Sequence, residues 1–194
     1  MGLATFIGGI HPYEGKELSE DKPIKVLEPL QGEIMVYPLS QHIGAPAKPL
    51  VAKGDHVLKG QIIAEAGGFI SANVLSSVSG TVKGIESKLV ANGAMVQSIL
   101  VENDGEEEAI EGFGTDRDAT KLSKEEIRKI VKDAGIVGLG GAGFPTHVKL
   151  TPKDENAIDY VIVNGAECEP YLNGDHLTMK NHPCLLYTSP SPRD

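Results

Sequence analysis

The chain has 194 residues, of which 40% are hydrophobic and 23% charged, a composition that allows one or two soluble domains with a hydrophobic core. Its formal net charge of −9 argues against nucleic acid as a partner, because nucleic-acid binding depends on clustered lysine and arginine. No apolar run approaches the roughly 20 residues that span a bilayer, and we see no signal peptide, so membrane association would depend on a partner protein. The two cysteines, Cys168 and Cys184, make neither a disulfide framework nor a complete metal site, which favours a reducing cytoplasm.

Residues 1–30 form an N-terminal segment that contains the string Gly8-Gly9-Ile10-His11-Pro12-Tyr13. His11 could act as a ligand or a catalytic base. A single histidine before a proline is more often a turn residue, and no acidic or thiol-bearing residue pairs with it at a recognisable spacing. The structural interpretation is therefore the better one for His11.

Residues 31–104 are predicted to form an all-β domain, since short runs rich in valine and isoleucine alternate with glycine turns. The segment Val51–Glu65 is echoed by Val90–Glu102, and each copy reads as a tight turn followed by a strand. We therefore expect two interlocked halves related by a pseudo-twofold axis. The string GDHVLKGQIIAE, followed by SSVSGTVKGI, resembles barrel-sandwich hybrid domains of the biotinyl/lipoyl type.

That resemblance raises a carrier function as a candidate. Such carriers present one lysine for a swinging arm on a hairpin between the two halves. The corresponding segment here, Ala66–Ser77, contains no lysine. The attachment chemistry is therefore absent, and we expect this domain to be structural.

Residues 105–120 are acidic and without periodicity, which is typical of a solvated linker, and we place the domain boundary there. A helix is expected next. Ser123 and Glu126 are spaced as a capping box, and Gly135 suits the position just after the last helical turn.

A partial α/β domain is expected over residues 121–183. Within it, residues 145–150 are predicted to form a second, short helix, and the β-branched run 158–164 a buried strand. The last eleven residues, 184–194, break sharply from what precedes them and end in a Ser/Pro string. They look like translated adapter or vector sequence, so we exclude them from the fold.

A glycine-rich segment lies between the two predicted helices. It contains Gly138, Gly140, Gly141 and Gly143, followed by Phe144 and Lys149. Glycine tolerates positive φ and has no Cβ, so such a loop can curl around a ligand, and the helix after it predicts an anion site of the nucleotide-phosphate kind. The letters also match the dinucleotide fingerprint, but a helix rather than a strand precedes them, which disfavours an ordinary Rossmann domain. A purely structural glycine turn remains as the alternative.

Longer motifs sharpen this prediction. The strings GLGGAGFPTHVKL and VIVNGAECEPYLNGDHLTM, together with GGIHPYEGK near the start, resemble the C subunits of Rnf ion-translocating ferredoxin:NAD⁺ oxidoreductases over residues 6–183. The first two strings recur more distantly in the FMN- and NADH-binding flavoprotein subunit of respiratory complex I. The predicted fold class is therefore α+β and multidomain, with an all-β barrel-sandwich hybrid followed by the start of an α/β FMN/NADH-binding domain.

The resemblance also implies residue roles. The glycine loop would wrap FMN, the aromatic residue after it would stack against the nicotinamide, and the lysine would contact the flavin. The asparagine would bond the isoalloxazine edge, with two acidic residues near the flavin and NADH. The implied cofactor-binding residues are Gly138, Gly140, Gly141, Gly143, Phe144, Lys149, Asn164, Glu167 and Glu169. Solvated loop carboxylates are the alternative for the two glutamates.

Departures from the complex I pattern put individual contacts in question. Leu139 replaces an arginine, His147 a glycine, and Ala166 the aspartate of the second motif. Leu150 stands in place of a tryptophan, and Cys168 in place of a serine, where we expect it to pack rather than react. The contacts are therefore expected to differ in detail, whereas the cofactor class stays the same.

In the family that the chain resembles, hydride exchange between NADH and FMN is linked to electron transfer through [4Fe–4S] clusters held in a C-terminal region. No cluster-binding cysteine run is present, so we expect this chain to be an N-terminal part of the protein, inactive alone. The resemblance also implies a peripheral position on the cytoplasmic side of the inner membrane, other Rnf subunits as partners, and ferredoxin and NAD(H) reached through the complex. The alternative is a non-catalytic scaffold that docks partner subunits and has a purely structural glycine loop.

Overall fold

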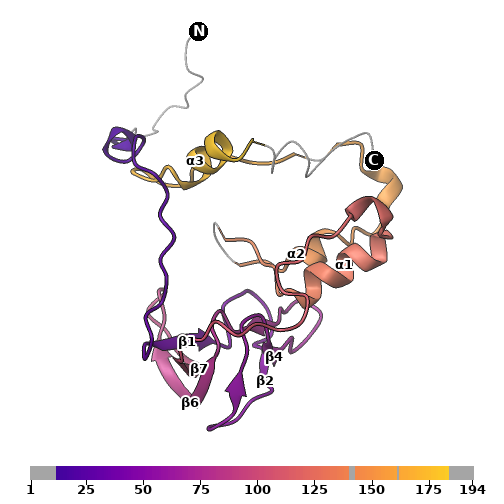
Figure 1. The fold of residues 1–194 in the computed structure, drawn as a ribbon. Coiled ribbons are helices and arrows are strands. Elements are labelled where there is room, and N and C mark those ends of the chain that lie inside the picture. The colour runs from indigo at the N-terminus through magenta and orange to yellow at the C-terminus, as the bar shows by residue number, and fades with distance from the viewer. Residues whose placement is uncertain (1–11, 140–142, 161, 184–194) are drawn as a thin grey trace. The chain divides into compact units, whose positions relative to one another are not determined.

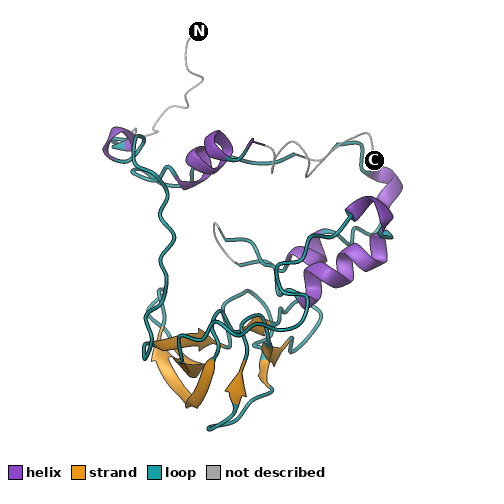
Figure 2. Cartoon of the chain, viewed as in Figure 1, coloured by secondary structure: helices purple, strands orange, loops and turns teal. Residues whose placement is uncertain are grey.

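The computed structural model describes residues 12–139, 143–160 and 162–183. The chain divides into two compact units, of which the first combines residues 1–27 with 158–194 and the second contains residues 28–157. Figure 2 shows the strands gathered in one part of the chain, and all of them belong to the second unit. The finer division into five segments expected from the sequence stays a prediction.

Two antiparallel sheets form the β-rich part of the second unit (Figure 1). The first sheet has the strand order β1-β7-β6-β3, and its strands are β1 (Ile34–Pro38), β3 (His56–Val57), β6 (Gly80–Leu89) and β7 (Met95–Asn103). The second has the order β2-β4-β5, with β2 (Lys48–Pro49), β4 (Ile62–Glu65) and β5 (Val74–Leu75). The hairpin of β6 and β7 is the longest pairing, and in its register Val82 lies opposite Val101 and Ile85 opposite Ile99.

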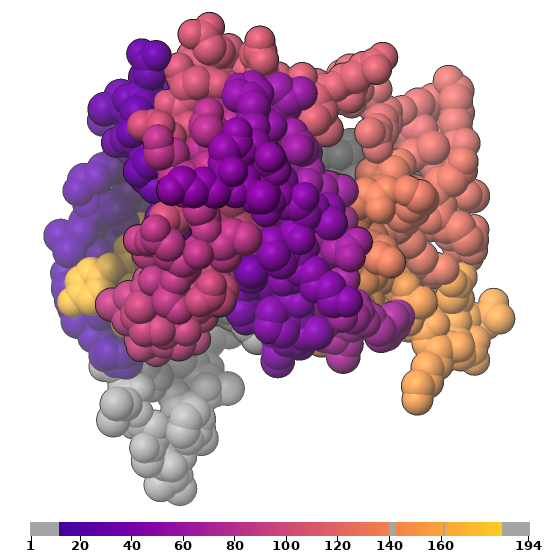
Figure 3. Space-filling model, turned by 90° about the horizontal axis from the view of Figure 1, so that it is seen from below, coloured from indigo at the N-terminus to yellow at the C-terminus, as the bar shows by residue number. Residues whose placement is uncertain are grey.

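The core of this part is apolar and largely β-branched. Val57, Ile63, Ile99 and Val101 are completely buried, and Val82 is 1% exposed. Burying a side chain of this size contributes about 1.5–3 kcal/mol relative to leaving it in water. Figure 3 shows the violet and magenta part of the chain as one packed mass. All of the described strands lie between Ile34 and Asn103, which confirms the predicted all-β character of this part, whereas its bounds stay a prediction.

The predicted internal repeat is visible in its turns and diverges in its strands. Gly54 and Gly93 have φ of 97° and 82° and occupy equivalent turns. In the first copy, Gly60 interrupts the strand, and the chain passes from β3 in one sheet to β4 in the other. The second copy continues as the single strand β7. This difference depends on which strands lie beside each copy, so the repeated sequence could not predict it.

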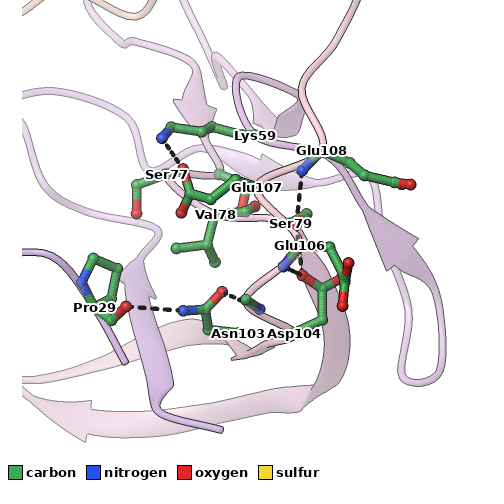
Figure 4. A network of polar contacts seen from close by, with 12 residues as sticks. Pro29, Lys59, Ser77, Val78, Ser79, Asn103, Asp104, Glu106, Glu107 and Glu108 are labelled. Carbon is green, nitrogen blue, oxygen red and sulfur yellow. Dashed lines mark hydrogen bonds and ion pairs between the residues drawn. The ribbon is translucent and has the colours of Figure 1, made fainter. Parts of the chain in front are cut away.

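The acidic segment after β7 is exposed, as expected of a linker, but its first residues are tied to the sheets (Figure 4). Just before this segment, the side-chain amide of buried Asn103, the last residue of β7, donates to the carbonyl oxygen of Pro29 at 3.2 Å. The hydroxyl of Ser79 donates to the Asp104 carboxylate at 2.6 Å and accepts from the Glu108 N–H at 3.1 Å. The bond from Ser79 is the main reason that the pKa of Asp104 lies below its usual value.

Helix α1 (Lys124–Asp133) forms where the sequence predicts it. Ser123 and Glu126 make both bonds of the capping box, and Gly135 follows the last turn with φ of 63°. Helix α2 (Thr146–Lys149) lies within the predicted range 145–150, with Pro145 as its N-cap residue and not in its first turn. Helix α3 (Gly174–Asn181) belongs to the first unit. Short 3₁₀ helices occur at Lys16–Leu18, Ala119–Lys121 and Glu155–Ala157.

The prediction of a buried strand at residues 158–164 is wrong for the described part of that run. Residues 158–160 and 162–164 have no strand conformation, and Tyr160 and Ile162 are 85% and 86% exposed. A strand needs a neighbour that pairs with its backbone N–H and C=O groups. None of the strands in the described ranges pairs with this run. Residues with high strand propensity are therefore not sufficient to form a strand here.

Candidate cofactor site

The two ends of the glycine-rich loop are held together by backbone contacts. The Gly138 N–H donates to the carbonyl oxygen of Phe144 at 3.0 Å, and Val137 forms a bridge with Pro145. Gly140 and Gly141 lie outside the described residues. The segment from α1 to Gly138 contains no strand longer than the Val137 bridge, which agrees with the argument against an ordinary Rossmann domain.

A cation and an aromatic ring lie at the base of this loop. The Lys149 ammonium, on the last residue of α2, lies 6.0 Å from the centre of the Phe144 ring. A Cβ built at Gly138 would lie 3.3 Å from the Lys149 nitrogen, closer than most real Cβ contacts. The absence of a side chain at Gly138 therefore leaves the space that Lys149 occupies. Lys149 is exposed and Phe144 half-buried, so both can meet a ligand.

This arrangement suits a planar, anionic ligand. A lysine supplies a full positive charge to an anion, a half-buried ring offers a face for stacking, and a glycine position permits close approach. FMN combines a phosphate with a flat isoalloxazine ring, so these residues fit it. The Gly138 N–H is already bonded to Phe144, so any contact of Gly138 with a ligand would rest on its missing side chain.

Arg128 braces the helix that precedes the loop against the helix that follows it. Its Nε donates to the carbonyl oxygen of Leu150, just after α2, at 2.7 Å. Its terminal nitrogen also pairs with Glu155. Hydrogen bonds from Lys124 and Arg128 lower the pKa of Glu155 to about 2, so this carboxylate stays ionised at neutral pH.

His147 lies on the buried side of α2 and is 8% exposed. Burial, together with the charge of Lys132, lowers its pKa from the usual value, and a hydrogen bond with the backbone of Phe69 opposes that shift. The neutral imidazole is therefore favoured. Sequence reasoning noted His147 only as a departure from a glycine, because nothing in its spacing indicated burial.

The acidic motif belongs to the first unit, whereas the glycine loop belongs to the second. Asn164 accepts the Ala166 N–H at 3.0 Å, and Glu167 accepts the His176 N–H at 3.0 Å in the first turn of α3. A carboxylate at a helix N-terminus is stabilised by the unpaired N–H groups there. Glu167 therefore has a structural role that the sequence did not indicate.

Sequence reasoning also missed a clasp, by which we mean the contacts of residues 13–19 with residues 169–173. The Lys16 ammonium donates to the carbonyl oxygens of Glu169 at 3.2 Å and Leu172 at 2.7 Å. Asn173, which is 6% exposed, donates to the carbonyl oxygen of Lys16 at 2.7 Å. The Tyr171 N–H donates to the carbonyl oxygen of Glu14 at 2.6 Å, and Tyr171 has a positive φ of 68°.

The clasp holds the segment that carries Glu169, and positive φ at a residue other than glycine persists only where the surroundings fix it. Residues more than 150 positions apart make these contacts, so no local pattern could have found them. His11, the candidate in the N-terminal segment, lies outside the described residues.

Comparison with known proteins accounts for both the sheets and the loop. Residues 4–106 match the family model described as the RnfC barrel-sandwich hybrid domain, which is more than half of the chain. The chain belongs to the RnfC family. Residues 131–188 match a second model, the Nuo51 FMN-binding domain. The predicted resemblance and the predicted fold class are both confirmed.

Relatives with descriptive names agree with this assignment. The chain is 45% identical, over 91% of its length, to the C subunit of the proton-translocating ferredoxin:NAD(+) oxidoreductase complex of Clostridium ljungdahlii. It is 46% identical over 90% of its length to the Na(+)-translocating counterpart of Acetobacterium woodii, and 42% over 89% to the C subunit of the ion-translocating oxidoreductase complex of Rhodobacter capsulatus. The chain spans 38%, 39% and 33% of these three relatives. The relatives are subunits of oxidoreductase complexes.

The described ranges contain neither a membrane-spanning helix nor a metal-binding cluster. None of the helices in these ranges is long and apolar enough to cross a membrane. Among the same residues, no three histidine, cysteine or acidic side chains gather in a way that could hold a metal ion.

Proposed function

We propose that this chain is the N-terminal part of an electron-transfer subunit of an ion-translocating ferredoxin:NAD⁺ oxidoreductase, and that its glycine loop binds FMN with NADH beside it. The observation that carries the proposal is the cluster of Lys149, Phe144 and bare Gly138 at the closed base of a loop that lies in the FMN-binding match. The names of the relatives support the wider activity.

The proposed roles come from the family resemblance, and the contacts at the base of the loop support those of Lys149, Phe144 and Gly138. Lys149 neutralises negative charge on the cofactor, Phe144 stacks against the nicotinamide, and the loop from Gly138 to Gly143, with Gly140 and Gly141, surrounds the flavin. Asn164, Glu167 and Glu169 border the isoalloxazine edge and NADH. Bound FMN would supply the conversion between two-electron hydride chemistry and single-electron transfer. The protein's own contribution is binding and orientation.

The remaining parts of the proposal extend what the family resemblance implies. We infer that [4Fe–4S] clusters lie in a part of the protein outside this chain, and that the chain alone is inactive. Other subunits of the complex hold it on the cytoplasmic side of the membrane, where ferredoxin and NAD(H) exchange electrons with the assembly.

The test is titration of the complete subunit with FMN, followed by flavin fluorescence. We expect Lys149→Met to weaken FMN binding at least tenfold, about 1.4 kcal/mol, since a hydrogen bond to a charged group contributes roughly 1.5–3 kcal/mol. Lys88→Met, which removes an equal charge from the end of β6, should leave affinity within twofold. No flavin binding by the unaltered subunit would overturn the proposal. Binding unchanged by Lys149→Met would favour the scaffold alternative, in which the glycine loop is only structural.

A further inference from the structure

Both ends of the glycine-rich segment press against the backbone of the barrel-sandwich. At Gly135, φ is 63° and a Cβ would lie 2.4 Å from the carbonyl oxygen of Asn73. At Gly143, φ is 62° and a Cβ would lie 2.8 Å from the carbonyl oxygen of Gln41. Real Cβ atoms do not approach other atoms so closely, and L-residues rarely adopt this backbone conformation. Two loops of the barrel-sandwich, at Gln41 and Asn73, therefore lie directly against the two ends of the segment.

Asn73 of the barrel-sandwich contacts the end of α1 directly. Its side-chain nitrogen lies 3.3 Å from the carbonyl oxygen of Asp133 and 3.5 Å from that of Lys132, the last residues of α1. Donors are favourable at a helix C-terminus, where the carbonyl groups lack helical partners. The side-chain oxygen of Asn73 faces the other way and accepts the Ala66 N–H at 2.9 Å. One side chain thus connects the loop between β4 and β5 to the end of α1.

His42 connects the two barrel-sandwich segments on which the glycine-rich segment rests. Its Nε2 accepts the Ala72 N–H at 3.2 Å, which leaves the proton on Nδ1 to donate to the carbonyl oxygen of Ile43 at 3.2 Å. The ring is 7% exposed. Residues 41–43 and 72–73 are therefore linked to each other as well as to the glycine-rich segment.

The loop between β4 and β5 is also the place where a carrier domain would present its lysine, and it has none. We propose that this loop, together with residues 41–42, holds the two ends of the glycine-rich segment, at Gly135 and Gly143, in place, and that Asn73 is the positioning residue. One consequence is that FMN affinity should depend on Asn73, although Asn73 does not touch the cofactor. This consequence rests on the proposed function. The barrel-sandwich would thus preorganise the site.

The substitution Asn73→Asp separates the two bonds that Asn73 makes. Aspartate keeps the acceptor for Ala66 and loses the donor for α1, and its charge is unfavourable at a helix C-terminus. In the complete subunit, we expect Asn73→Asp to raise the FMN dissociation constant at least tenfold, about as much as Asn73→Ala. Affinity within twofold of the unaltered subunit would overturn the proposal, because Asn73 would then serve only its own loop.

The pair Gly135→Ala and Gly93→Ala tests the contact itself. Both glycines have positive φ, but a Cβ at Gly93 meets nothing within 4 Å. Gly135→Ala should weaken FMN binding at least tenfold, and Gly93→Ala less than twofold. Equal effects would contradict the proposal, because backbone strain alone would then explain both.

Hydrogen exchange without flavin makes the test independent of the proposed function. The Gly138 and Thr146 N–H groups donate to Phe144 and Ile136 across the base of the loop. In Asn73→Asp they should exchange at least fivefold faster, while the amides of the β6–β7 hairpin keep their rates. Unchanged exchange at Gly138 and Thr146 overturns the positioning role, even if the unaltered subunit binds no FMN. Faster exchange in a subunit without flavin affinity would support the positioning role and overturn the proposed function alone.

Discussion

The β6–β7 hairpin and the run 158–164 are similar in amino-acid composition but differ in structure. Both are rich in valine and isoleucine, yet Ile99 and Val101 in the hairpin are completely buried, whereas Ile158 and Ile162 are 54% and 86% exposed. The hairpin strands pair with each other and with strands on either side. The run 158–164 pairs with no strand in the described ranges.

The difference shows that strand propensity expresses a fit to neighbours. β-branched side chains stabilise a strand by packing across the sheet, and the backbone must exchange its bonds to water for bonds to a partner. The hairpin obtains both from sequence-adjacent residues joined by the Gly93 turn. The described residues of the run 158–164 have no such local partner, so β-branched side chains alone do not make them a strand.

The largest effect expected from this comparison is on stability. Ile99→Ala should lower the free energy of unfolding by about 2–5 kcal/mol, because it removes a buried side chain and leaves a cavity. The matched substitution Ile162→Ala should change it by less than about 0.5 kcal/mol, because that side chain is already in water. Urea denaturation followed by circular dichroism measures both. A comparable loss in the two variants would show that the run at 158–164 is packed.

An intermediate effect is expected where distant residues do hold the first unit together. Asn173→Ala removes the two hydrogen bonds that this buried side chain donates, to the Lys16 carbonyl oxygen and to the Ser19 hydroxyl, and their loss should cost about 1–3 kcal/mol. The Tyr171 amide, which donates to Glu14, should then exchange with solvent tenfold or more faster. Asn181→Ala, at the exposed end of α3, serves as the control and should leave this rate unchanged. Unaltered protection of Tyr171 in Asn173→Ala would contradict the clasp.

The smallest effect concerns pH and the buried His147. Burial lowers its folded-state pKa below the unfolded value near 6.5, so the unfolded chain binds the proton more readily. The neutral ring therefore stabilises the fold fully above pH 6.5, and this contribution is lost as pH falls through the folded pKa. Thermal unfolding between pH 5 and 8 should show this loss in the unaltered protein. In His147→Gln the slope over this window should be shallower, and an identical slope would rule out His147 as its source.

Much of the second unit could be predicted because its determinants are close together in sequence. The capping box of α1, the glycine after its last turn and the start of α2 after Pro145 each depend on residues within one or two helical turns. The cluster of Gly138, Phe144 and Lys149 is local in the same sense, since a closed loop and one short helix bring it together. The motif that carries these residues, together with the strings VIVNGAECEPYLNGDHLTM and GGIHPYEGK, also indicated the RnfC family.

Other features were decided by the tertiary structure. The sequence predicted a buried strand at residues 158–164, but the described part of that run pairs with none of the described strands. It also did not indicate that Glu167 accepts a hydrogen bond from the first turn of α3. It gave no sign that Lys16 holds residues 169–172, or that Asn73 connects the barrel-sandwich to α1. A hydrogen bond between residues far apart depends on where the intervening chain folds, which no local pattern encodes. The amino-acid sequence of this protein thus determines its local geometry, whereas the hydrogen-bond partners of its buried polar groups are determined only by the tertiary structure.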